Sequence, residues 1–288
     1  MSFIHVNGIR LHYEHMGSGP HVIMVHGLAA NLAFWCLSIV PRLAGRFCIT
    51  AYDLRGHGES DMPPSGYDRL SMCADLAALV NRFNIDHFHL IGHSFGGLVA
   101  LEFVSSHPDR VRSLTLADVP LGNSGSSDRV AEQRHWNVMR KGLARAGISI
   151  PAQMPRIPYP LLQELAVRDM APARQWRSSA QPLVPFGLWN GSSKSATRWL
   201  QLLRTTNALA EFDIPDTVSS QWARHFARPI LLIVGERSRW IEASHILGDN
   251  LPNSRTVIIP NADHFHPLQW PEQFAQHVSD FLLGDGAA

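Results

Sequence analysis

The chain has 288 residues and a formal net charge of +1, with 45% of its residues hydrophobic and 17% charged. This composition is typical of a globular protein with a large core, and the lack of a basic run argues against a nucleic acid partner. No stretch of about 20 apolar residues occurs, so we expect no transmembrane helix and no membrane partner.

Cysteine content and the N-terminal residues indicate a cytoplasmic protein. Cys36, Cys48 and Cys73 are few and odd in number, which favours a reducing compartment over a disulfide framework. The first eight residues lack the basic-then-apolar order of a signal peptide. Sixteen histidines are present, but none stands beside the paired cysteines of a zinc site, so we expect no metal. The sequence leaves the oligomeric state open.

Strands are predicted along most of the chain. Eight segments have strand-like composition and turn residues at their ends: 1–6, 7–15, 21–25, 47–52, 88–91, 111–116, 230–234 and 256–259. The first two form a hairpin that turns at Asn7-Gly8. The later ones are short apolar runs, typical of strands buried in a parallel sheet.

Segments with helical spacing follow several of these strands, at 70–83, from Phe95 to about His107-Pro108, and at 271–283. Strands that alternate with helices predict an α/β fold. We therefore expect a mostly parallel eight-stranded sheet with helices on both faces.

The alternation stops between Val119 and Arg228. This stretch has five of the eight tryptophans, many prolines and no parallel-strand signal. It predicts a mostly helical cap, residues 120–227, inserted into a core made of residues 1–119 and 228–288. The tryptophans either pack the interior of the cap or line a pocket beneath it.

The residues Gly92-His93-Ser94-Phe95-Gly96 follow one predicted strand and open a helix. A serine on so sharp a turn is lifted clear of the sheet with strained backbone angles. The glycines two residues to either side are expected because a Cβ there would strike the neighbouring strand and helix. The first amides of the helix point at the same place, ready to hold an oxyanion.

This G-x-S-x-G segment and three others resemble the α/β-hydrolase superfamily, in its lidded branch of esterases, lactonases and carbon–carbon bond hydrolases. The other three segments are residues 25–31, 53–60 and 262–267. The resemblance implies that Ser94 is the nucleophile and that His264, in the loop after the last strand, is the base. His266, two residues on, is the competing base.

The resemblance also implies an oxyanion hole made by the backbone amides of Leu28 and Phe95. His26 and His57 are expected to be structural histidines of their loops. Haloalkane dehalogenases and epoxide hydrolases of this fold use an aspartate nucleophile, so Ser94 argues against both activities.

The acid departs from the usual pattern of the superfamily. Ser238 occupies the position after the seventh strand where an aspartate is expected. Some members supply the acid after the sixth strand, and here that residue is Asp118. We therefore predict a Ser94–His264–Asp118 triad, with Glu236 and Glu242 as alternative acids and a dyad without an acid as a further possibility.

Together these features predict a serine hydrolase that cleaves an ester, lactone or thioester bond of a mainly apolar small molecule through an acyl-enzyme, without a cofactor. Alternatives on the same scaffold are a cofactor-free oxygenase, a carbon–carbon hydrolase and a lyase. The missing aspartate at Ser238 also allows a ligand-binding protein without catalysis.

Overall fold

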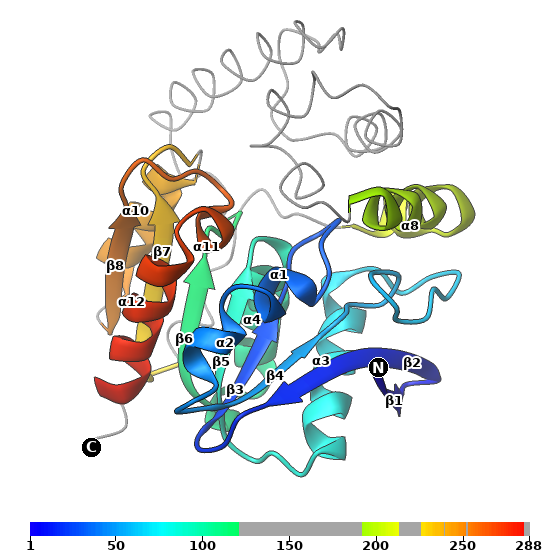
Figure 1. Ribbon diagram of the computed structural model, residues 1–288, viewed down its shortest axis with the longest axis horizontal. Helices are drawn as coiled ribbons and strands as arrows, with labels where there is room; N and C mark the ends of the chain where they lie inside the picture. Colours follow the sequence, from blue (N-terminus) through cyan, green and yellow to red (C-terminus); the bar gives the residue numbers. More distant parts are fainter. Residues whose placement is uncertain (121–191, 213–225, 239, 252, 285–288) are drawn as a thin grey trace, which may run out of the picture.

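The computed structural model describes residues 1–120, 192–212, 226–238, 240–251 and 253–284, and its ribbon is shown in Figure 1. These residues form one sheet of eight strands: β1 (Ser2–Val6), β2 (Ile9–Met16), β3 (His21–Val25), β4 (Cys48–Tyr52), β5 (Phe88–His93), β6 (Val111–Ala117), β7 (Ile230–Gly235) and β8 (Ser254–Ile259). The predicted strands agree with these bounds to within two residues.

The strands lie in the order β1-β2-β4-β3-β5-β6-β7-β8. The hairpin β1–β2 is antiparallel and joins β4 in the antiparallel sense. From β4 onward every pairing is parallel. The carboxyl ends of β3 to β8 therefore meet at one edge of the sheet, which is where parallel α/β folds place their functional residues.

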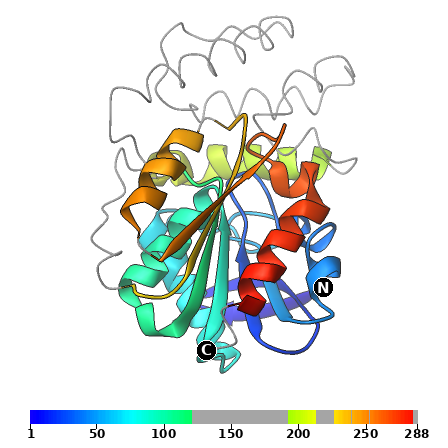
Figure 2. The same ribbon diagram turned by 90° about the vertical axis from the view of Figure 1, so that its left-hand side faces the viewer.

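Helices cover both faces of the sheet, as Figure 2 shows from the side. The helices and short helical turns in the described residues are α1 (Ala33–Cys36), α2 (Val40–Leu43), α3 (Arg69–Arg82), α4 (Phe95–Ser106), a 3₁₀ turn (Pro108–Arg110), α8 (Ser192–Thr205), α9 (Ala208–Glu211), α10 (Ile241–Asn250), α11 (His266–Gln269) and α12 (Pro271–Gly284). One core cluster lies under α3, α4 and α10, and a second under α1, α2 and α12. Burial on both faces explains why β4 and β7 consist almost entirely of apolar residues.

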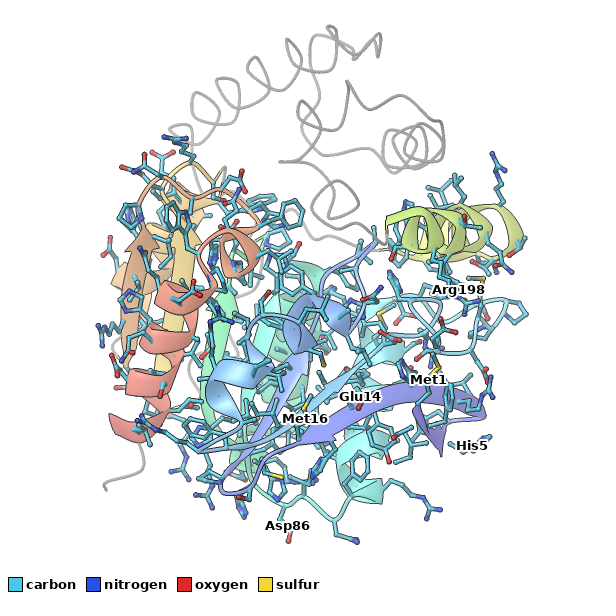
Figure 3. The ribbon with its side chains drawn as sticks, in the orientation of Figure 1. Met1, His5, Glu14, Met16, Asp86 and Arg198 are labelled. Carbon is cyan, nitrogen blue, oxygen red and sulfur yellow. The ribbon has the colours of Figure 1, made fainter. Side chains whose placement is uncertain are left out.

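The predicted cap falls largely on residues 121–191 and 213–225, which lie outside the described residues, so the division at 120–227 stays a prediction. The described part of this stretch is helical, as α8 and α9. It lies beyond the carboxyl ends of the strands and is bonded to the loops there. Ser195 of α8 accepts from Asn31 Nδ2 at 3.1 Å, and Arg198 of α8, labelled in Figure 3, donates to the backbone carbonyl of Ser60.

Within the described residues, no helix combines the length and apolarity needed to cross a membrane.

Candidate active site

Ser94 stands on the sharp turn between β5 and α4, with φ 53° and ψ −124°. The two flanking glycines explain how so tight a turn can form. A Cβ on Gly92 would lie 2.5 Å from the carbonyl oxygen of Gly96, and a Cβ on Gly96 would lie 2.4 Å from that of Val25. Both obstacles are backbone atoms, so the prediction that these positions require glycine is confirmed.

His264 lies in the loop between β8 and α11, and its ring reaches back to Ser94. His264 Nε2 is 3.0 Å from Ser94 Oγ, and His264 Nδ1 is 2.9 Å from Asp118 Oδ1. Because an ionised carboxylate only accepts hydrogen bonds, Nδ1 carries the proton. Nε2 is then left with a lone pair for the serine hydroxyl, the arrangement that a general base requires.

Asp118 follows β6 directly and is fully enclosed. Its Oδ1 accepts from His264 Nδ1 and, at 2.5 Å, from Ser238 Oγ. Its Oδ2 accepts from the backbone N–H of Gly235 at 3.0 Å. Burial would raise the pKa of the Asp118 carboxyl, but the bond from His264, the nearby imidazoles of His264 and His266 and the bond from Ser238 together hold that pKa below its ordinary value. Asp118 is therefore ionised at neutral pH.

The other candidate acids lie elsewhere. Glu236 is exposed, and its Oε2 accepts from the backbone N–H of Asn261 at 2.7 Å. Glu242 belongs to the first turn of α10, and among the described residues its buried Oε2 has no hydrogen-bond partner. Of the three carboxylates weighed from the sequence, the structure brings Asp118 to the histidine.

His266 is fully buried, and its Nε2 is 3.8 Å from Asp118 Oδ2, too far for a hydrogen bond. Burial lowers the pKa of His266 to about 4, so the ring is neutral. The imidazole that contacts Ser94 belongs to His264, while His266 faces the opposite side of the acid.

The loop after β3 lies against Ser94. A Cβ on Gly27 would lie 2.9 Å from the Cβ of Ser94. His26 Nδ1 donates to the carbonyl of Gly27 at 2.8 Å, and His26 Nε2 accepts from the N–H of Leu54 at 3.1 Å. These two bonds use both ring nitrogens, and they confirm the prediction that His26 is a structural residue of this loop.

The Gly27 carbonyl and the Leu28 N–H belong to one trans peptide unit, so holding the carbonyl turns the N–H to the opposite side. Among the described residues, neither the N–H of Leu28 nor that of Phe95 has a hydrogen-bond partner. Phe95 is the first residue of α4, where amide groups are left free for an anion. These are the two donors that the sequence assigned to an oxyanion hole.

His93 is a residue whose role the sequence did not reveal. Its Nε2 donates to the backbone carbonyl of His264 at 2.9 Å, and its ring stacks on Phe34 with centroids 4.5 Å apart. Burial lowers its pKa well below the ordinary value, so the ring is neutral. His93 thus ties the loop of His264 to the strand that leads into Ser94, and its place beside Ser94 was the only signal available.

Asp53, the first residue after β4, is buried against the loop that follows β3. Its Oδ1 accepts from the N–H of Leu32 at 2.6 Å, and its Oδ2 accepts from the ring of His12 at 2.7 Å. The first bond holds the Leu32 end of the loop from Gly27 to Leu32 against the end of β4, and the second ties Asp53 to β2. In the part of the chain that the structure describes, no cluster of three histidine, cysteine, aspartate or glutamate side chains could hold a metal ion.

Comparison with known proteins identifies a family whose sequence pattern matches this chain and several proteins that are similar to most of its length. A family described as "alpha/beta hydrolase fold" matches residues 20–269. A 2-(acetamidomethylene)succinate hydrolase of Mesorhizobium japonicum is 27% identical over 97% of this chain and 94% of its own. The putative carbamate hydrolase RutD of Stutzerimonas stutzeri is 28% identical over 94% of this chain and 96% of its own. A solved thermophilic esterase from Thermogutta terrifontis has the same fold, with a TM-score of 0.65 and 23% identity over 99% of each chain.

Proposed function

Because the chain belongs to the α/β-hydrolase family, we propose that it is a serine hydrolase that cleaves an ester, lactone or thioester bond of a mainly apolar small molecule. The observation that carries this proposal is the linear contact from Ser94 Oγ through His264 to Asp118, with distances of 3.0 and 2.9 Å. Nucleophile, base and orienting acid are the three roles that acyl transfer requires of a protein.

In the first half of the proposed reaction, Ser94 Oγ attacks the carbonyl carbon and His264 Nε2 takes the hydroxyl proton. Asp118 keeps the Nδ1–H tautomer in place and stabilises the imidazolium that forms. The carbonyl oxygen becomes an oxyanion, which the amides of Leu28 and Phe95 receive. His264 then gives its proton to the leaving alcohol or thiol as the acyl-enzyme forms.

In the second half, water takes the place of the leaving group. His264 removes one proton from that water, whose oxygen attacks the acyl carbon, and a second oxyanion forms at the same donors. Collapse of this intermediate expels Ser94 Oγ, which recovers its proton from His264. The carboxylic acid leaves, and every step uses groups of this chain and water.

A second candidate is hydrolysis of an amide or carbamate, which the names of the two full-length relatives favour. The same residues serve it, except that His264 must protonate a poorer, nitrogen leaving group. Matched ester and amide substrates with one acyl group would separate the two, since the ester hydrolase expected here prefers the ester.

Labelling with a fluorophosphonate tests the proposal directly. We expect the wild type to be labelled at Ser94 and to hydrolyse aryl esters, and we expect Ser94→Ala to lose both properties. Absence of labelling in folded wild type would favour the binding protein without catalysis. Hydrolysis that survives in Ser94→Ala would contradict the assignment, and consumption of oxygen with a heteroaromatic substrate would favour the oxygenase.

A further inference from the structure

Ser238 is buried in the turn that follows β7, with 4% of its surface exposed. Its backbone N–H donates to the carbonyl of Gly235 at 2.9 Å, which closes the turn. β6 and β7 are parallel neighbours, and the N–H of Asp118 donates to the carbonyl of Ile233 at 2.9 Å. The ends of these two strands therefore bring residues 120 positions apart in the chain into contact.

The direction of the bond between the two side chains follows from chemistry. Ser238 Oγ is 2.5 Å from Asp118 Oδ1, and the ionised carboxylate has no proton to give, so the hydroxyl donates. The same hydroxyl oxygen accepts from the backbone N–H of Trp240 at 3.0 Å. Ser238 is thus held in one rotamer by a partner on each side.

Asp118 Oδ1 receives two donors at once, the hydroxyl of Ser238 and Nδ1–H of His264. We propose that Ser238 is a positioning residue that acts on His264 through Asp118, an inference that rests on the proposed function. Ser238 fixes the rotation of the Asp118 carboxylate, and it draws part of the negative charge of Oδ1 away from the bond with His264. A donor at this point weakens the pull of Asp118 on the imidazolium.

Five elements next to the triad or to the loop of His264 carry the other charged or titratable groups of this region. His93 lies on β5, with its ring centroid 4.8 Å from that of His264. Asp263 precedes His264 in its loop, His266 lies on α11, Glu236 and Arg237 are exposed in the turn after β7, and Glu242 begins α10. In the described residues, Ser238 is the side chain that shares Asp118 Oδ1 with His264.

The test compares Ser238→Ala with wild type over a range of pH. Without the hydroxyl, more of the negative charge of Asp118 Oδ1 acts on its bond with His264, which favours the protonated form of that histidine. The acid limb of the pH profile of kcat/KM should therefore move to higher pH by about 0.5 unit or more. Ser238→Thr keeps the hydroxyl and should restore the limb toward the wild-type position. A merely structural serine predicts lower activity at every pH with the limb unmoved, and that result would overturn the proposal.

A matched control is Ser113→Ala. Ser113 is a buried serine of β6 whose hydroxyl lies 2.7 Å from His89 Nδ1, away from the triad. We expect this variant to leave the acid limb where it is. Thermal unfolding of all three variants shows whether each one folds.

A second readout does not depend on activity. The ring resonances of His264, assigned by their loss in His264→Gln, are followed by NMR through a pH titration of wild type and Ser238→Ala. A titration midpoint that rises in Ser238→Ala supports the proposal even if no ester is cleaved, in which case the proposed function alone fails. An unchanged midpoint refutes the role of Ser238 whatever the substrate.

Discussion

The backbone φ of Asp118 is 51°, in the left-handed region that aspartate and asparagine adopt more readily than most other residues. This conformation directs a fully buried carboxylate toward three donors, Nδ1–H of His264, the hydroxyl of Ser238 and the N–H of Gly235. The charge is solvated by the protein in place of water, which keeps the acid ionised without access to solvent.

At the scale of this residue, Asp118→Asn should lower kcat for an aryl ester about 10⁴-fold, the loss known for the acid of serine proteases. The amide keeps the shape of the side chain but cannot hold the histidine in the required tautomer. Glu236→Gln is the control, because Glu236 contacts Asn261 instead of His264. A large loss in Glu236→Gln with little loss in Asp118→Asn would show that the acid is Glu236 and not Asp118.

The packing of β3 against α4 depends on Gly96. A Cβ added to Gly96 would lie 2.4 Å from the carbonyl oxygen of Val25 and 2.5 Å from that of His26. Neither oxygen can move without shifting the end of the central strand β3. Gly96→Ala should therefore lower the free energy of unfolding by about 3 kcal/mol, the upper part of the range for overpacking.

The matched control for Gly96→Ala is Gly45→Ala, because a Cβ added at Gly45 meets nothing within 4 Å. We expect it to change the free energy of unfolding little, as measured by urea denaturation. If Gly96→Ala unfolds at the same urea concentration as Gly45→Ala, the close approach of β3 and α4 is not what requires glycine.

The strands, the helices and the residues of the candidate site were predictable from the sequence to different degrees. The runs at 21–25 and 230–234 read as strands because burial on both faces leaves them almost wholly apolar. The helix α10 and the short α1 and α2 were not predicted, since they lack a regular apolar spacing. Ser94 and His264 follow from local motifs. Asp118 was predicted as the acid from its place directly after the sixth strand, whereas its contact with Ser238 depends on distances between strands that no local pattern records.

The molecule as a whole contains several buried histidines that stay neutral. Burial lowers the pKa of His57 to about 3 and the pKa of His89 and His266 to about 4. An unfolded histidine binds a proton near pH 6.5, whereas these three do not in the folded state. As the pH falls below 6.5, the unfolded state gains protons first, so the fold loses stability until the folded pKa values are reached.

We expect the free energy of unfolding to fall between about pH 6.5 and pH 4.5, by up to about 1.4 kcal/mol per pH unit for each such histidine. Urea denaturation across this range measures the slope. His89→Gln removes one of these groups and should reduce the slope by about that amount, whereas His87→Gln, at an exposed position next to β5, should not. Equal slopes in the two variants would show that buried histidines do not set the acid limit.

Ser94, Asp118 and the loop after β3 all precede residue 120 in the chain, and only His264 comes from beyond the return of the chain into the sheet at Ile230. The residues proposed as nucleophile, acid and oxyanion donors consequently stand at the ends of adjoining strands within one continuous stretch of sequence. Their relative placement is therefore set by the pairing of β3, β5 and β6 alone, whereas the placement of His264 also requires the later pairing of β7 and β8 with that sheet.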